Sequence, residues 1–204
     1  FEDHVFGVLL LNDWSARDIQ AFEYQPLGPF LGKSFATSVA PWVVPLDALA
    51  PFMVPGWVPR QDPEPAAYLR DTTPHMPALR FEVLLTSQQM RAAGCAPVVV
   101  STVALEEALY WSMPQQLAHA TVNGASVRTG DVFATGTLSG PDPMTQAGSL
   151  IERTWRGECP LVLPTGETRA FLADGDEVTL RGWCGAGTDR VDLGEVTGVV
   201  RGGR

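Results

Sequence analysis

The sequence has few of the residues on which several large classes of protein depend. Only 3 of its 204 residues are cysteine, and Cys95, Cys159 and Cys184 lie far apart and form no C-x-x-C pair. They therefore indicate neither a disulfide framework nor a thiolate zinc site, and a reduced, cytoplasmic location is expected. No apolar run approaches the ~20 residues of a membrane-spanning helix, so a membrane is not expected as a partner.

Basic residues are also scarce. Lys and Arg number 14 against 23 Asp and Glu, which gives a formal net charge of −9. Phosphate binding needs a clustered basic face, and no run of Lys or Arg supplies one, so nucleic acid is not expected as a partner. The three histidines, His4, His75 and His119, do not have the spacing of metal ligands.

What the sequence does contain is the composition of one globular domain. Apolar residues make up 45% and charged residues 18%, and a chain of this length can bury roughly 70% of its unfolded surface. The first residue is Phe1 rather than Met, and an apolar run begins at Val5 with no basic segment or cleavage site before it. We therefore expect the chain to be part of a longer protein.

Short strands are expected to dominate the fold. Apolar or alternating patterns predict strands at residues 5–11, 78–87 and 96–103. The strand at 78–87 would place Leu79, Phe81, Val83 and Leu85 on one face. Frequent turn signals after residue 122 indicate that the second half is also mainly β.

Helices are expected to be few. A short one is predicted at residues 15–22, capped by the side chain of Asp13 or Ser15, and the best one at 105–120, with a kink or boundary at Pro114. Repeated prolines exclude long regular elements around residues 41–65, and 51–76 is predicted to be a surface excursion.

The densest group of polar residues follows the first predicted strand. Asp13, Arg17 and Gln20 are spaced i, i+4 and i+7, so on a helical turn they can face one pocket. A hard cation prefers carboxylate oxygens, and an anionic oxo acid is recognised by a bidentate Arg beside a neutral donor. The alternative is a surface Asp–Arg pair with a solvated Gln20.

Lys33 and Thr37 follow a loop rich in Pro and Gly, and Gly32-Lys33-Ser34 is predicted to lie on that loop. A nucleotide-binding phosphate loop is excluded, because Gly28 and Gly32 enclose three residues where that loop needs four. Lys33 is then either a fixed cation that stabilises an oxyanion or an ordinary surface lysine.

Two further candidates lie in the second half. Residues 131–141 read as a strand that ends at the glycine-flanked Thr137, where backbone amides and a hydroxyl could hold a carboxylate, or as a simple β-turn. Glu152 lies in an apolar, strand-like stretch, where it could be partly buried and orient a catalytic histidine. Alternatively, it is an outward-facing carboxylate paired with Arg153 or Arg169.

Taken together, these segments resemble the fumarylacetoacetase family. The resemblance rests on residues 11–20 (LNDWSARDIQ), 24–35 (YQPLGPFLGKSF) and 41–45 (PWVVP), with shorter matches at 115–117, 136–141 and 174–178. It extends over essentially the whole chain, and it implies a partial C-terminal catalytic domain over residues 1–204. The implied fold is mainly β (α+β), a mixed β-sandwich roll with one or two helices, and the implied assembly is a homodimer.

The resemblance also assigns roles to individual residues. Asp13 would bind a divalent cation, Ca²⁺ or Mg²⁺, and Lys33 with Thr37 would hold a second, structural cation through oxygen atoms. The implied catalytic residues are Arg17, Gln20, Lys33 and Glu152, the last of which would orient the histidine that activates water. The substrate would be bound by Gln20, Tyr24 and Thr137.

The implied reaction is hydrolysis of a carbon–carbon bond in a diketo acid, 4-fumarylacetoacetate, to fumarate and acetoacetate. Water would attack the carbonyl on the fumaroyl side, and acetoacetate would leave as an enolate stabilised by the cation. In the family, the other metal-binding carboxylates and the catalytic histidine lie upstream of a strand like 5–11. Asp13 would then be a single protein ligand, whereas a divalent cation needs about six oxygens, some of them from water. We therefore expect this chain alone to be inactive. Two alternatives to fumarylacetoacetate hydrolysis remain. One is a related oxo-acid hydratase or decarboxylase of the same fold, and the other is a non-catalytic assembly module.

Overall fold

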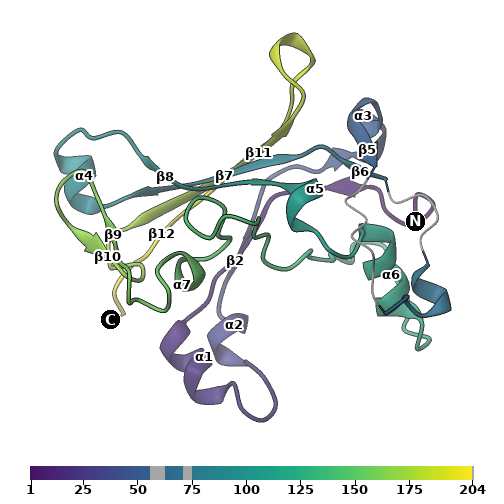
Figure 1. The fold of residues 1–204 in the computed structure, drawn as a ribbon, viewed down its shortest axis with the longest axis horizontal. Helices are drawn as coiled ribbons and strands as arrows, with labels where there is room; N and C mark the ends of the chain where they lie inside the picture. Colours follow the sequence, from purple (N-terminus) through teal and green to yellow (C-terminus); the bar gives the residue numbers. More distant parts are fainter. Residues whose placement is uncertain (56–62, 71–74, 204) are drawn as a thin grey trace.

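A four-stranded antiparallel sheet is the centre of the fold (Figure 1). The computed structural model describes residues 1–55, 63–70 and 75–203. In the sheet order β12-β11-β7-β8, the strands are β7 (Arg80–Thr86), β8 (Val98–Ala104), β11 (Glu177–Cys184) and β12 (Val191–Val199). The strands expected at 78–87 and 96–103 are confirmed, as is the mixed α+β class.

The other strands form two-stranded antiparallel pairs. These are β1 (Gly7–Val8) with β4 (Val44–Pro45), β2 (Leu11–Asp13) with β3 (Thr37–Val39), β5 (Met53–Pro55) with β6 (His75–Pro77), and β9 (Leu161–Val162) with β10 (Thr168–Arg169). The single strand expected over 5–11 is therefore wrong. The chain forms two short strands there, because β1 and β2 pair with different partners.

The helices are shorter and more numerous than expected. Across the described residues they are α1 (Arg17–Glu23), α2 (Leu31–Ser34), α3 (Leu46–Leu49), α4 (Gln88–Ala92), α5 (Leu105–Ala108), α6 (Met113–Thr121) and α7 (Leu150–Arg153), with 3-10 turns η1 (Ala50–Phe52), η2 (Ala67–Leu69) and η3 (Gly187–Asp189). None of them combines the length and apolarity needed to cross a bilayer.

The helix expected over 105–120 is divided into α5 and α6. Pro114 lies in the first turn of α6, where its missing N–H costs nothing, so it marks a boundary rather than a kink. Ser112 caps this new start, since its hydroxyl accepts from Gln115 N (3.3 Å) while Gln115 Oε1 accepts from Ser112 N (2.9 Å). The capping box therefore decides where the second helix begins.

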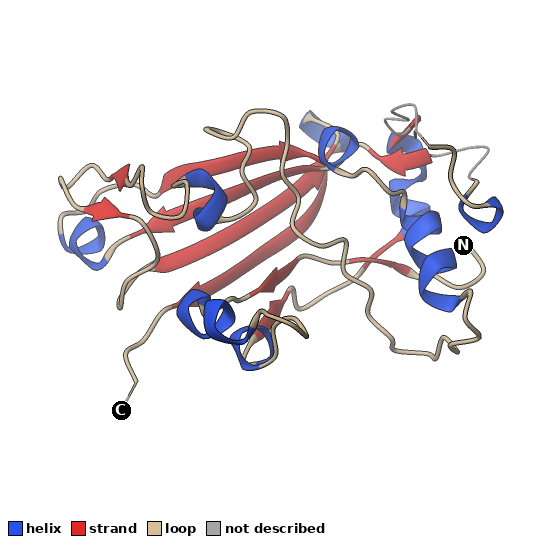
Figure 2. Cartoon of the chain, turned by 60° about the horizontal axis from the view of Figure 1, so that its bottom comes forward, coloured by secondary structure: helices blue, strands red, loops and turns tan. Residues whose placement is uncertain are grey.

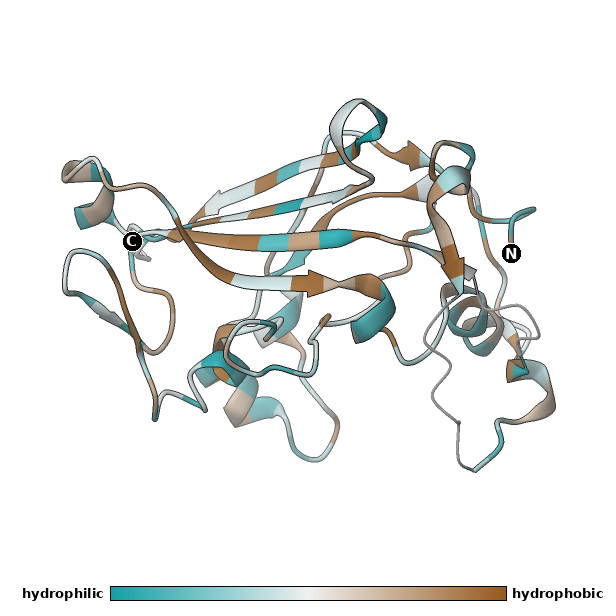
Figure 3. Ribbon diagram, turned by 45° about the horizontal axis from the view of Figure 1, so that its top comes forward, coloured by the Kyte–Doolittle hydropathy of each residue, from teal (hydrophilic) through white to brown (hydrophobic). Residues whose placement is uncertain are grey.

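Hydrophobic positions, brown in Figure 3, recur along the strands of the sheet. The buried apolar side chains form two clusters. The larger includes Leu49, Met76, Leu79 and Leu193, each at most 3% exposed, and the smaller is centred on Leu85. Met76 shows that the excursion expected over 51–76 reaches the core, although residues 56–62 and 71–74 of that range lie outside the described part of the chain. As predicted, Phe81 and Val83 also pack against these clusters.

The segment between α6 and α7 has no regular structure over residues 122–149, all of which are described. The strand expected to end at Thr137 is therefore wrong. Residues 131–137 are exposed and have no backbone partner strand, so the local β pattern is not supported by a neighbour there.

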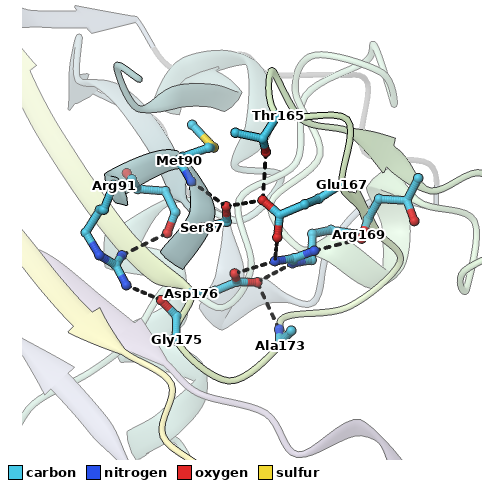
Figure 4. A network of polar contacts seen from close by, with 11 residues as sticks. Ser87, Met90, Arg91, Thr165, Glu167, Arg169, Ala173, Gly175 and Asp176 are labelled. Atoms are coloured by element: carbon cyan, nitrogen blue, oxygen red, sulfur yellow. Dashed lines mark hydrogen bonds and ion pairs between the residues drawn. The ribbon is translucent and has the colours of Figure 1, made fainter. Parts of the chain in front are cut away.

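A polar network closes the end of the sheet near α4 (Figure 4). Arg169 Nε lies 2.7 Å from Asp176 Oδ2, and its Nη2 lies 2.8 Å from Glu167 Oε1. Glu167 also accepts from the hydroxyls of Ser87, which caps α4, and Thr165. Asp176 and Ser87 are fully buried. The β9–β10 hairpin is thereby fixed to the start of α4 by charge-assisted hydrogen bonds.

This network predicts a specific dependence of stability on acid. The hydrogen bond from Ser87, with those from Thr165 and Arg169, lowers the pKa of Glu167 from 4.5 to about 2. A lowered carboxylate pKa contributes stability that is present above pH 4.5 and is lost as the pH falls towards 2. We expect Glu167→Gln to flatten the pH dependence of the urea midpoint in that window. Equal slopes for wild type, Glu167→Gln and the exposed control Glu158→Gln would contradict this.

Candidate functional site

The candidate site begins where β2 ends. Asp13 is the last residue of β2 and lies opposite Thr37 of β3 in the strand register. The next residue, Trp14, packs against β12, where a Cβ on Gly198 would lie only 2.6 Å from the indole. Trp14 Nε1 also donates to Ser38 Oγ at 2.9 Å. The glycine makes room for the indole, so Asp13 is held at a fixed place beside the sheet.

Helices α1 and α2 form a small hairpin below the sheet (Figure 2). Ala16 N donates to Gly32 O at 2.8 Å, and a Cβ on Gly32 would lie 2.7 Å from Gln20 N. Two expectations are corrected here: Gly32-Lys33-Ser34 lies in α2 rather than on a loop, and α1 has Ala16 as N-cap with no side-chain cap from Asp13 or Ser15. Backbone contact between the helices replaces that cap.

This hairpin directs Lys33 back to β2. Lys33 Nζ lies 2.7 Å from Asp13 Oδ2 and donates to Ser15 Oγ at 2.9 Å. The two charged side chains are 31% and 48% exposed, so the pair is partly screened by water. Lys33 is the only lysine of the chain, and its ammonium is held by Asp13 and Ser15.

Arg17 and Gln20 also act as a pair. Arg17 Nη1 donates to Gln20 Oε1 at 2.8 Å. Burial lowers the pKa of Arg17 below its usual value, while the charges of Glu152 and Asp13 oppose that shift. A guanidinium is charged in proteins in any case. The alternative of an exposed Asp13–Arg17 pair with a solvated Gln20 is therefore wrong: Asp13 pairs with Lys33, and Arg17 with Gln20.

Glu152 is placed differently from the expectation. It lies in helix α7 rather than in a strand, and its side chain is exposed, which confirms the outward-facing alternative over the partly buried one. Its carboxylate accepts from Ser139 Oγ at 2.6 Å, and Ser139 Oγ accepts from Gly148 N at 3.1 Å. The suggested pairing with Arg169 is wrong, because Arg169 pairs with Glu167 and Asp176 in the network near α4.

An open cavity of about 2090 Å³ lies between the sheet, the α1–α2 hairpin and the segment 127–138. Asp13, Arg17, Lys33 and Thr137 all line it. Gln20, Tyr24, Thr37 and Glu152 do not belong to its lining. Tyr24 follows α1 and is 54% exposed, whereas Gln20 reaches the cavity only through its bond to Arg17.

The cavity is electropositive in an acidic chain. It is lined by seven of the 14 basic residues but by only five of the 23 acidic residues. An excess of one sign of charge in a cleft with apolar walls focuses the field and attracts ligands of the opposite sign. The expected ligand chemistry is therefore that of a small organic anion.

The described residues do not fit a complete site for a divalent cation. They contain no group of three or more His, Cys, Asp or Glu side chains placed to hold one metal. Asp13 offers one carboxylate, which already accepts the ammonium of Lys33. Because Ca²⁺ and Mg²⁺ take about six oxygens, Asp13 can contribute only part of such a site.

Sequence reasoning missed three contributors to this site. Ser15 binds Lys33, Ser139 binds Glu152, and Glu23 binds the start of α2. Each contact joins residues between 7 and 18 positions apart. None of these spacings belongs to a helix or strand period, so the sequence pattern does not predict the contacts. Ser15 and Ser139 do lie inside stretches that carry the family resemblance, which was the only available signal.

Comparison with known proteins gives the family of the chain. The family model described as "Fumarylacetoacetate (FAA) hydrolase C-terminal" matches residues 1–201. Fumarylacetoacetase of Homo sapiens is 48% identical over 198 residues, which are 97% of this chain and 45% of that protein. The Arabidopsis thaliana fumarylacetoacetase is 49% identical with the same two coverages. That of Caenorhabditis elegans is 48% identical over 200 residues, or 98% and 46%.

This chain belongs to the fumarylacetoacetate hydrolase family, of which it matches the C-terminal domain. It spans a little under half the length of the curated relatives it matches.

The close contact between α1 and α2 predicts that a methyl group added at Gly32 lowers the free energy of unfolding. In Gly32→Ala the new Cβ would meet Gln20 N and Cα at 2.7 and 2.9 Å, so α2, which carries Lys33, must move away from α1. Overpacking of this kind costs about 1–3 kcal/mol, which urea unfolding can measure. Gly203→Ala is the matched control, since nothing lies within 4 Å of its Cβ. Equal unfolding free energies for the two variants would show that the close approach is unimportant.

Proposed function

We propose that this chain forms part of a fumarylacetoacetase, which hydrolyses 4-fumarylacetoacetate to fumarate and acetoacetate in the last step of tyrosine and phenylalanine breakdown. The observation that carries the proposal is the electropositive cavity, in which Arg17 and Lys33 are held by specific partners. A substrate with two carboxylates suits such a cavity. The relatives named fumarylacetoacetase supply the reaction.

The residues of this chain would act mainly by binding and by charge. Arg17, held by Gln20, is suited to bind an oxo or carboxylate group with two parallel N–H donors. The ammonium of Lys33 is suited to stabilise the enolate oxygen of acetoacetate as the carbon–carbon bond breaks. Thr137 would bind the other substrate carboxylate. Tyr24, which lies outside the cavity lining, would contact the substrate from the edge of the site.

We further propose that the reaction needs Ca²⁺ or Mg²⁺ and that Asp13 supplies one of its ligands. A second, structural cation would use oxygens near Lys33 and Thr37. The remaining ligands, and the histidine that Glu152 would orient, would come from residues outside the described part of this chain, because the described residues do not form a complete metal site. We also propose that the enzyme works in the cytoplasm as a homodimer.

The decisive test compares two proteins. The first is the 204-residue chain, and the second is the longest open reading frame that contains it, each assayed for fumarylacetoacetate hydrolysis with added Mg²⁺ or Ca²⁺. We expect activity in the longer protein only. Activity on simple 2-oxo acids without fumarylacetoacetate hydrolysis would instead indicate a hydratase or decarboxylase, and no activity in either protein would favour an assembly module.

In the active protein, Lys33 can be tested separately from Arg17. Lys33→Met removes the charge but keeps the length of the side chain, and we expect kcat to fall about 10²–10³-fold, as for loss of one oxyanion donor. Arg17→Met should mainly raise KM, because it removes a contact that substrate and transition state share. Steady-state kinetics would distinguish these effects, and an unchanged kcat in Lys33→Met would contradict the assigned role.

A further inference from the structure

Glu23, the last residue of α1, binds the beginning of α2. Its Oε1 accepts from Phe30 N at 2.7 Å and from Gly32 N at 2.6 Å, and its Oε2 accepts from Leu31 N at 3.1 Å. These N–H groups belong to the N-cap and first turn of α2, where a helix provides no partners of its own. One carboxylate therefore satisfies three backbone donors.

From this arrangement we infer that Glu23 is a positioning residue for Lys33: it holds α2 in the place from which the ammonium reaches Asp13 and Ser15. Lys33 directly follows Gly32 in α2, and its Nζ must return to β2 to make both contacts. The inference concerns the site described above, and the importance of Lys33 to catalysis rests on the proposed function.

Helix α2 needs such an anchor because it is too short to be stable without tertiary contacts. It has four residues, whereas isolated helices shorter than about 12–15 residues are marginal in water. Of its members only Gly32 is buried, so little apolar burial holds α2 in place. Leu31 and the N-cap Phe30 are 68% and 55% exposed. The bond from Ala16 N to Gly32 O fixes one point, and the Glu23 carboxylate fixes its start from the other end of α1.

The chemistry of the contact favours a carboxylate over a neutral side chain. Desolvation raises the pKa of Glu23, but the three backbone N–H bonds outweigh that effect and lower it below its usual value. A glutamine could still accept at one oxygen, yet its amide would direct N–H groups at one of the backbone donors.

The experiment uses the fact that the 204-residue chain has one lysine. Labelling with ¹⁵N-lysine therefore gives a single ammonium signal, and its hydrogen-exchange rate reports whether Lys33 is held by Asp13 and Ser15. In Glu23→Ala we expect exchange to accelerate about tenfold or more, because the hydrogen bonds to charged groups are lost. Glu23→Gln should fall between Glu23→Ala and wild type. Glu158→Ala, an exposed control after α7, should match wild type.

Each outcome decides the inference. Unchanged Lys33 exchange in a folded Glu23→Ala protein would overturn it, and so would equal acceleration in Glu158→Ala. If Glu23→Ala does not fold, Glu23→Gln decides: faster exchange with an unaltered Trp14 indole signal supports positioning, and wild-type exchange overturns it. The readout needs no turnover, so the two proposals can fail separately. Faster Lys33 exchange in Glu23→Ala with unchanged fumarylacetoacetate hydrolysis by the longer protein would contradict the proposed role of Lys33 and leave the positioning role of Glu23 intact.

Discussion

The candidate site depends on the close backbone approach of α2 to α1. Gly32 lies against Gln20 with no space for a Cβ, and this contact lets two very short helices pack as one unit. Because they are packed, the side chain of Lys33 reaches Asp13 and Ser15, although these residues are up to 20 positions away along the chain. Without that contact, a four-residue helix would have little reason to hold one orientation, and the main cation of the site would be a solvated surface lysine.

The rest of the fold provides the support for this unit. Glycines in β12 admit tryptophan rings: Gly198 lies against Trp14, and Gly194 lies against Trp42. The Trp14 contact fixes the end of β2 to the sheet at the point where Asp13 emerges. At the same end of the sheet, where Gly198 lies opposite Val178, the polar network of Figure 4 lies beside the smaller apolar cluster. Its buried charges are fully paired, as burial of a charge requires.

Charge distribution links this architecture to function. The chain as a whole is acidic, yet half of its basic residues line one cavity. The cavity has cationic groups that suit an organic anion, but within the described residues it has only a part of the oxygen ligands that a divalent cation needs. The match to the human fumarylacetoacetase covers 97% of this chain and 45% of that protein.

The sequence by itself determined the α+β class, the two long strands at 78–87 and 96–103, an interruption at Pro114 and, through the resemblance, the family. These follow from local pattern and from long matching stretches. Only the tertiary structure decided that Asp13 pairs with Lys33 rather than Arg17, that Glu152 lies exposed on a helix, and that residues 131–137 form no strand. The physical reason is that side-chain pairing and strand formation depend on neighbours distant in sequence, such as Ser15, Ser139 and Glu23, whose proximity no local pattern encodes.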